Sequence, residues 1–342
     1  MRINRKRIVA MDLLRTLSTI AVILIHVTST ILYNSNSKGL TYNFSLIFNQ
    51  IARFSVPAFI FLSGFGLALS YNRKSTYIDY FYHRLKKILP EYLIWYVLYI
   101  FLLQDTNMSM HDKIISIFNG KLYYHFYFVP IIIILYVIFP LFHRFFKTTF
   151  ALFVTFIMNM GICILLRYPN IPKNIKENLA RENVINWIFY FVLGIYIYNN
   201  YDNIYAFLKR HTNKLLVLLL VSTYILLKDT YLCLKINNNL DYGTTFLRPS
   251  VMLFSILVIL YIMSFKFNNL SIRKLLYVIS KNSYTIYLSH PLFLYWLKKY
   301  YIQNKYVIES YKFFILSFLV CFNGMLLISI LINKYKKIII KA

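Results

Sequence analysis

Long apolar stretches make up most of the chain, and they limit its possible fold more than any other feature. Ten of them reach or approach the ~17–25 residues that a helix needs to cross the hydrocarbon core of a bilayer. They are residues 8–33, 45–70, 88–103, 123–142, 149–167, 184–200, 214–234, 246–265, 275–297 and 312–333. The sequence therefore predicts an all-α, polytopic membrane protein of about ten transmembrane helices. Residues 1–342 would form one integral-membrane domain with no separate soluble domain.

The distribution of charge supports this prediction and indicates an orientation. Only 14% of the 342 residues are charged, yet the net charge is +27. The basic residues lie in short segments between the apolar runs, as the positive-inside rule predicts, so we expect no nucleic-acid partner. With the N-terminus inside, the inner segments hold 21 of these basic residues and the outer segments 13. This favours a topology with both termini in the cytoplasm. Three dispersed cysteines form neither a disulfide framework nor a metal motif, so we expect no metal.

The first apolar stretch contains ionisable residues where a lipid-facing helix would have none. Arg15 and His26 are eleven residues apart, which places them on one helix face about 16 Å apart along the axis. Asp12 precedes Arg15 by three residues and joins the same face. Ionisable groups at membrane depth indicate a functional site. The alternative is a structural Asp12–Arg15 ion pair, with His26 as a hydrogen-bond donor between helices.

The second stretch places a cation beside a proline. Pro57 cannot donate a hydrogen bond to the carbonyl of Arg53, so a bend is expected there. Ser63 and Gly64 would let a second backbone or a slender ligand approach closely. Helix packing alone would also explain this Ser-Gly pair, but it would not explain Arg53.

Two further segments carry candidate binding groups. Arg84 and Lys87 are one helical turn apart and are suited to hold phosphates, although lipid headgroups would also attract such a basic run. Ser283, Tyr287 and His290 share a helix face, and Pro291 frees the carbonyl of Tyr287 beside the histidine. A structural hydrogen bond is the alternative role for His290.

Taken together, these residues resemble the acyltransferase 3 family of membrane proteins, which O-acylate surface glycans, macrolides and related acceptors. The resemblance covers nearly the whole chain. Its carriers are Asp12-Leu-Leu-Arg15 with His26, Val56-Pro57 with Ser63-Gly64-Phe65, Arg84-x-x-Lys87 with Pro90, His125-Phe-Tyr-Phe with Tyr136 and Pro140, and Tyr284-x-x-Tyr287 with His290-Pro291. Lys87 and Tyr127 depart from the arginine and tryptophan that are common in the family. Residues 187–194 also look like the branch implicated in export and succinylation of the intercellular adhesin, poly-N-acetylglucosamine.

The resemblance implies an enzyme of the bacterial cytoplasmic membrane that acylates a cell-surface polysaccharide or lipid-linked glycan. Acyl-CoA would be a co-substrate rather than a permanently bound cofactor, carrying acetyl or alternatively succinyl. We expect Arg15, Arg84 and Lys87 to hold its phosphates, with Ser63, Gly64 and Tyr287 along its path. His26 would act as general base, His290 is the rival base, and Arg53 would stabilise the oxyanion or bind the acceptor. Direct transfer and an acyl-enzyme both remain open, and so does a homo-oligomer. An exporter or flippase of a surface polysaccharide or its precursor is the competing class.

Overall fold

The computed structural model describes residues 8–35, 38–71, 76–103, 109–168, 171–237, 239–266 and 269–339, and within these ranges the regular structure is entirely helical. This confirms the all-α prediction. Six helical segments in the described part are long and apolar enough to cross a membrane. They are Val9–Asn34, Leu40–Ser70, Phe128–Phe146, Thr212–Ile236, Leu240–Met263 and Tyr311–Ile332. Ten spans and cytoplasmic termini stay predictions.

The chain forms two compact units, and each is described by itself. The first comprises residues 1–59, 202–246 and 250–342, and the second comprises residues 60–201 and 247–249. Both units are therefore discontinuous in sequence, the first with three segments and the second with two. That the whole chain acts as one domain stays a prediction.

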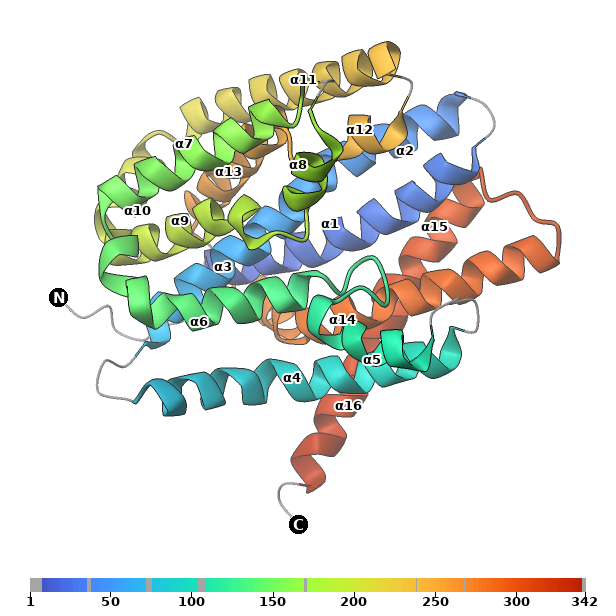
Figure 1. Ribbon diagram of the computed structural model, residues 1–342, viewed down its shortest axis with the longest axis horizontal. Helices are drawn as coiled ribbons and strands as arrows, with labels where there is room; N and C mark the ends of the chain where they lie inside the picture. Colours follow the sequence, from blue (N-terminus) through green and yellow to red (C-terminus); the bar gives the residue numbers. More distant parts are fainter. Residues whose placement is uncertain are drawn as a thin grey trace. The chain divides into compact units, whose positions relative to one another are not determined.

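The first unit is built around helix α1, Val9–Asn34. α1 packs against α2 (Leu40–Ile51), which lies beside it in Figure 1, and against α14 (Leu270–Gln303) and α15 (Tyr311–Leu319). The same unit holds most of α10 (Tyr201–Arg210) and α13 (Pro249–Met263), with α11 (Thr212–Asn237), α12 (Leu240–Thr244) and α16 (Met325–Ile339).

Several hydroxyl groups of α1 donate hydrogen bonds within the helix itself. Ser18 donates to the Leu14 carbonyl at 2.7 Å, Thr19 to that of Arg15 at 2.8 Å, and Thr30 to that of His26 at 2.9 Å. A hydroxyl bonded to the carbonyl four residues earlier is satisfied without water. These three hydroxyl groups are thus compatible with a regular helix among apolar neighbours.

The second apolar stretch is interrupted where the sequence predicts a bend. α2 ends at Ile51, a 3₁₀ turn (η1) covers Ala52–Phe54, and α3 begins at Ser55 and runs to Ser70. Pro57 lies in the first turn of α3, where its missing N–H costs no intrahelical bond. The turn carries the buried Arg53.

The second unit contains α4 (Tyr77–Leu102), α5 (Met110–Asn119), α6 (Phe128–Phe146), α7 (Thr149–Leu165), α8 (Lys173–Asn178), the 3₁₀ turn η2 (Val184–Asn186) and α9 (Ile188–Asn199), together with α3 from Ile60 onward. Helices α3 and α9 approach through two glycines. A Cβ added at Gly64 would lie 2.1 Å from the Phe191 carbonyl oxygen, and one at Gly194 would lie 2.2 Å from that of Phe61. Glycine is therefore required at both positions by the contact between the two backbones.

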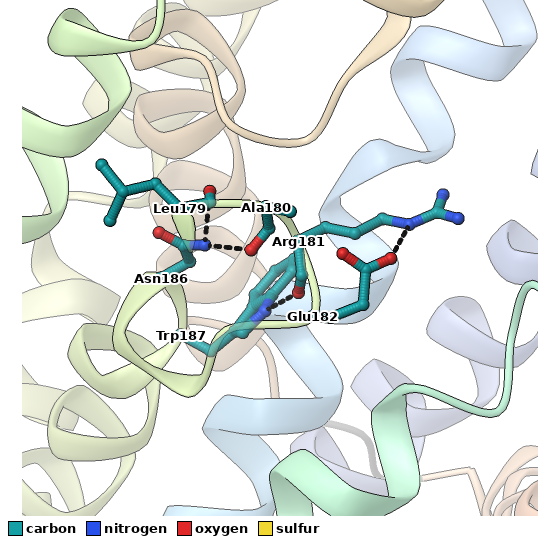
Figure 2. Close-up of polar contacts among 6 residues, drawn as sticks. All are labelled: Leu179, Ala180, Arg181, Glu182, Asn186 and Trp187. Atoms are coloured by element: carbon teal, nitrogen blue, oxygen red, sulfur yellow. Dashed lines mark hydrogen bonds and ion pairs between the residues drawn. The ribbon is translucent and has the colours of Figure 1, made fainter. Parts of the chain in front are cut away.

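A loop in the second unit is fastened to the start of α9 (Figure 2). The Asn186 amide donates to the carbonyls of Leu179 at 3.1 Å and Ala180 at 2.7 Å. The Trp187 indole donates to the Arg181 carbonyl at 2.8 Å. These bonds fix the backbone of residues 179–183, which connect α8 to η2 and belong to no helix. The Arg181 guanidinium extends from it, bonded to Glu182 at 3.0 Å.

Candidate active site

His26 and His290 lie against each other in the first unit. Their ring centroids are 5.2 Å apart and the ring planes are inclined by 35°. His26 comes from α1 and is partly exposed, whereas His290 comes from α14 and is 0% exposed. Two residues treated as rivals in the sequence are therefore neighbours. Because His290 is buried and His26 is partly exposed, His26 is the more accessible of the two rings.

The hydrogen bond of His290 fixes the protonation of its ring. Its Nδ1 lies 2.9 Å from the carbonyl oxygen of Ile286. A carbonyl oxygen only accepts, so Nδ1 carries the proton, and in the neutral ring Nε2 holds the lone pair. Pro291 follows directly and removes the N–H that would otherwise bond to Tyr287, which keeps this part of α14 free of one regular helix bond.

Aromatic and sulfur groups surround the buried histidine. Tyr287 has its ring centroid 6.3 Å from that of His290, and it also contacts the Phe59 ring with the centroids 6.3 Å apart. Cys321, fully buried in a π-helical turn (η3, Val320–Gly324), directs its thiol to the His290 carbonyl at 3.5 Å. Such π-turns occur mostly as local bulges, frequently at functional sites. Cys321 is a further residue that the sequence did not predict at this site.

Arg53 is held by an amide on the preceding turn. Its guanidinium donates from Nε at 3.2 Å and from Nη2 at 2.7 Å to Oδ1 of Asn49, and it lies over the Phe246 ring at 4.5 Å. The Asn49 Nδ2 group donates to the Ile25 carbonyl at 3.1 Å and to the hydroxyls of Thr28 and Ser29 at 3.0 Å. Asn49 thereby links Arg53 to the turn of α1 that carries His26.

The orientation of the Asn49 amide is unambiguous. Arginine only donates and a backbone carbonyl only accepts, so Oδ1 must face Arg53 and Nδ2 must face Ile25. Asn49 and the adjoining Gln50 are both 0% exposed, and Gln50 accepts from the Thr230 hydroxyl of α11 at 3.3 Å. Asn49 is not among the site residues predicted from the sequence. The sequence signal for Asn49 was the pair Asn49-Gln50 within the apolar run 45–70, one helical turn before Arg53, the only arginine of that run.

Arg15 and Asp12 lie nearer the beginning of α1. Arg15 is partly exposed, and the Asp12 carboxylate accepts from the Ser280 hydroxyl of α14 at 2.8 Å. The two contacts Asp12–Ser280 and His26–His290 show that α1 and α14 run in the same general direction. The pairing of Asp12 with Arg15 and a role of Arg15 in holding the phosphates of acyl-CoA stay predictions.

The remaining predicted residues belong to the second unit. Arg84, on α4, donates to the Ser70 hydroxyl at the end of α3 at 2.5 Å and lies over the Tyr80 ring at 5.6 Å. Lys87, one turn further, is exposed. Burial raises the pKa of the Tyr80 phenol, so this ring meets Arg84 as a neutral group. Ser63 is partly exposed, while Gly64 is accounted for by its contact with α9. Roles of these residues in donor binding stay predictions.

The fold and these contacts define the class of protein. It is an all-helical membrane protein in which two histidines pack against each other and a buried arginine is hydrogen-bonded to an amide side chain. The chain belongs to the acyltransferase 3 family: the family model described as an acyltransferase domain matches residues 8–334.

Named relatives come from staphylococci. The chain is 29% identical over 307 residues to a probable poly-beta-1,6-N-acetyl-D-glucosamine export protein of Staphylococcus aureus strain MRSA252, covering 82% of this chain and 81% of that protein. A protein of the same name from Staphylococcus epidermidis is 27% identical over 300 residues, covering 82% and 79%. No solved structure matches.

Proposed function

We propose that the protein is a membrane O-acyltransferase that moves an acyl group from acyl-CoA to a hydroxyl of a cell-surface glycan. Membership of an acyltransferase family supports the reaction type. The contact of His26 with His290 at 5.2 Å is the structural observation that carries the proposal. It places the partly exposed imidazole of His26, which would meet the substrate, against the imidazole of His290, whose Nδ1 carries a proton.

In this reaction His26 removes the proton of the acceptor hydroxyl as the oxygen attacks the thioester carbonyl. The carbonyl π-electrons move to oxygen, giving a tetrahedral intermediate whose negative oxygen requires a cation or hydrogen-bond donors. Collapse of the intermediate re-forms the carbonyl and breaks the carbon–sulfur bond. The CoA thiolate leaves and takes up the proton from His26, so the ring is returned to its starting state.

Arg53 is suited to support this chemistry. Arg53 is 6% exposed, and the direction of its guanidinium is fixed by Asn49, which is bonded to Ile25 and Ser29, before and after His26 on α1. A preoriented cation in a region of low dielectric stabilises developing negative charge better than a mobile one. We propose that Arg53 binds either the oxyanion or the acceptor.

The donor would be acetyl-CoA or succinyl-CoA, with its phosphates held by Arg84 and Lys87. The bond to Ser70 and the stacking on Tyr80 give Arg84 a defined direction, which favours it over a freely solvated lysine as a phosphate ligand. The staphylococcal relatives support a bacterial plasma membrane as the location and a poly-N-acetylglucosamine-like polymer as the acceptor.

Export of a polysaccharide is the second candidate function, because both relatives carry the word export in their names. Transfer and export differ in the fate of the acyl donor. Membranes that contain the protein would be incubated with acetyl-CoA or succinyl-CoA labelled in the acyl carbon, together with poly-N-acetylglucosamine. We expect label on the polymer, in a linkage that mild base cleaves. Movement of polymer across the membrane with no label on it would favour export.

A further inference from the structure

Helix α11 carries a shallow groove of about 400 Å³ that has no part in the site above. It is lined by Tyr224, Leu227, Lys228, Tyr231, Leu232 and Lys235. Tyr224, Lys228, Tyr231 and Lys235 follow one another by four, three and four residues, so they share one helix face. The groove therefore combines apolar walls with a stripe of alternating tyrosines and lysines.

The two lysines give the groove two positive charges, and neither lysine has an ion-pair partner among the described residues. Both lysines are exposed. Asp229 is adjacent to Lys228 in sequence but is engaged elsewhere, accepting from the Ser250 hydroxyl at 2.5 Å and the Cys233 thiol at 3.5 Å. Lys228 lies over the Tyr224 ring at 5.9 Å.

The apolar surroundings indicate what kind of anion fits. α11 is one of the six spans, and large apolar side chains on it are exposed, among them Leu232, 48% exposed. A lysine within such a span is costly unless its ammonium group reaches the interface or meets an opposite charge. Tyrosines at the same level are typical of the headgroup region. A small soluble anion would not cover the leucines, whereas a phospholipid supplies both a phosphate and acyl chains.

From these observations we infer that the α11 groove binds an anionic glycerophospholipid. Its phosphate lies between Lys228 and Lys235, which are about 10 Å apart along the helix axis. Its acyl chains extend from there toward the start of α11 and cover Leu227, and Tyr231 lies beside the headgroup. This site is independent of acyl transfer, so the inference does not depend on the proposed function.

The test uses the full-length protein in detergent with photoactivatable phosphatidylglycerol, and phosphatidylcholine with identical chains as the zwitterionic probe. We expect phosphatidylglycerol to label the α11 peptide, as mapped by mass spectrometry, and phosphatidylcholine to label it much less. Each surface lysine contributes roughly a 5-fold change in affinity for an anionic lipid. The double variant Lys228→Gln/Lys235→Gln should therefore lose most of the preference, and Lys228→Arg/Lys235→Arg should keep it.

The matched control removes two exposed lysines outside the groove, Lys209→Gln/Lys214→Gln, and should label like the wild type. Equal labelling by the two lipids would overturn the inference, because the groove would then be only an acyl-chain surface. So would undiminished labelling of the Lys228→Gln/Lys235→Gln variant, or an equal loss in the control. Competition by millimolar glycerol 3-phosphate as effective as that by the lipid would show that a free phosphate, rather than a lipid, is the ligand.

Discussion

At the scale of single residues, the site depends on pairs of side chains that hold each other in defined orientations. The His290 ring is hydrogen-bonded to the Ile286 carbonyl and packs against His26. Asn49 accepts from Arg53 and donates to the Ile25 carbonyl, in the turn of α1 that carries His26. A hydrogen bond made by a buried polar group offsets part of the cost of removing that group from water. Each of these pairs therefore stabilises the fold and also positions a group for the proposed reaction.

The histidine pair should behave as one functional unit. We expect His290→Gln to slow acyl transfer, because His26 then loses the ring it packs against. The double variant His26→Gln/His290→Gln should be no slower than His26→Gln alone, since residues that act together give non-additive effects. Initial rates of label transfer in membranes with matched protein levels measure this. Losses that multiply would show that the two histidines act separately.

Asn49 offers a test of the link between Arg53 and α1. Asn49→Ala leaves the guanidinium without its amide acceptor, which should destabilise the protein by about 1–3 kcal/mol and slow transfer. Asn49→Asp keeps an acceptor for Arg53 but turns a carboxylate oxygen toward the Ile25 carbonyl, so it should restore neither stability nor rate fully. Thermal unfolding in detergent and the transfer assay report the two effects.

The control for Asn49 is Asn43→Ala in the same helix, a partly exposed position where the amide bonds to the Lys38 and Gly39 carbonyls at 3.3 Å and 3.2 Å. It should leave the rate of transfer unchanged. A wild-type rate in Asn49→Ala would show that the direction of Arg53 does not matter to the reaction.

At the scale of helices, close approach of backbones determines which residues are tolerated. Gly64→Ala would place a methyl group against the Phe191 carbonyl, so α3 and α9 must separate, and we expect a loss of about 1–3 kcal/mol. Gly66→Ala, two residues further on α3, meets nothing within 4 Å and should be neutral or stabilising. Thermal unfolding of the two variants compares them directly. Equal stability would mean that α3 and α9 do not pack through Gly64.

The helices and several site residues could be predicted from the sequence because their signals are local. Apolar runs predicted helices, Pro57 predicted the interruption before α3, and the spacing of Arg15 and His26 predicted that both lie on one helix, which is α1. The contact of His26 with His290 could not be predicted, since it joins residues 264 positions apart through the packing of α1 on α14. Asn49 was missed because its role depends on partners in α1, and its spacing to Arg53 does not reveal which residues of another helix it contacts.

At the scale of the whole molecule, the orientation in the membrane is the open prediction with the widest consequences. Cytoplasmic termini place Lys38 outside and Lys209 inside. The three native cysteines are buried, so single cysteines can be introduced for labelling. In intact cells a membrane-impermeant maleimide should label Lys38→Cys and should label Lys209→Cys only after permeabilisation. The reverse pattern would contradict the predicted topology.

The central claim is that His26 takes the proton of a glycan hydroxyl during transfer from acyl-CoA. Its most direct test is the transfer of labelled acyl groups to polysaccharide by membranes that contain His26→Gln, compared with the wild type at equal protein levels. Because general-base catalysis contributes about 10²–10⁴-fold to a rate, we expect transfer to fall by at least 100-fold while the protein still unfolds cooperatively. Transfer at the wild-type rate by folded His26→Gln would contradict the account.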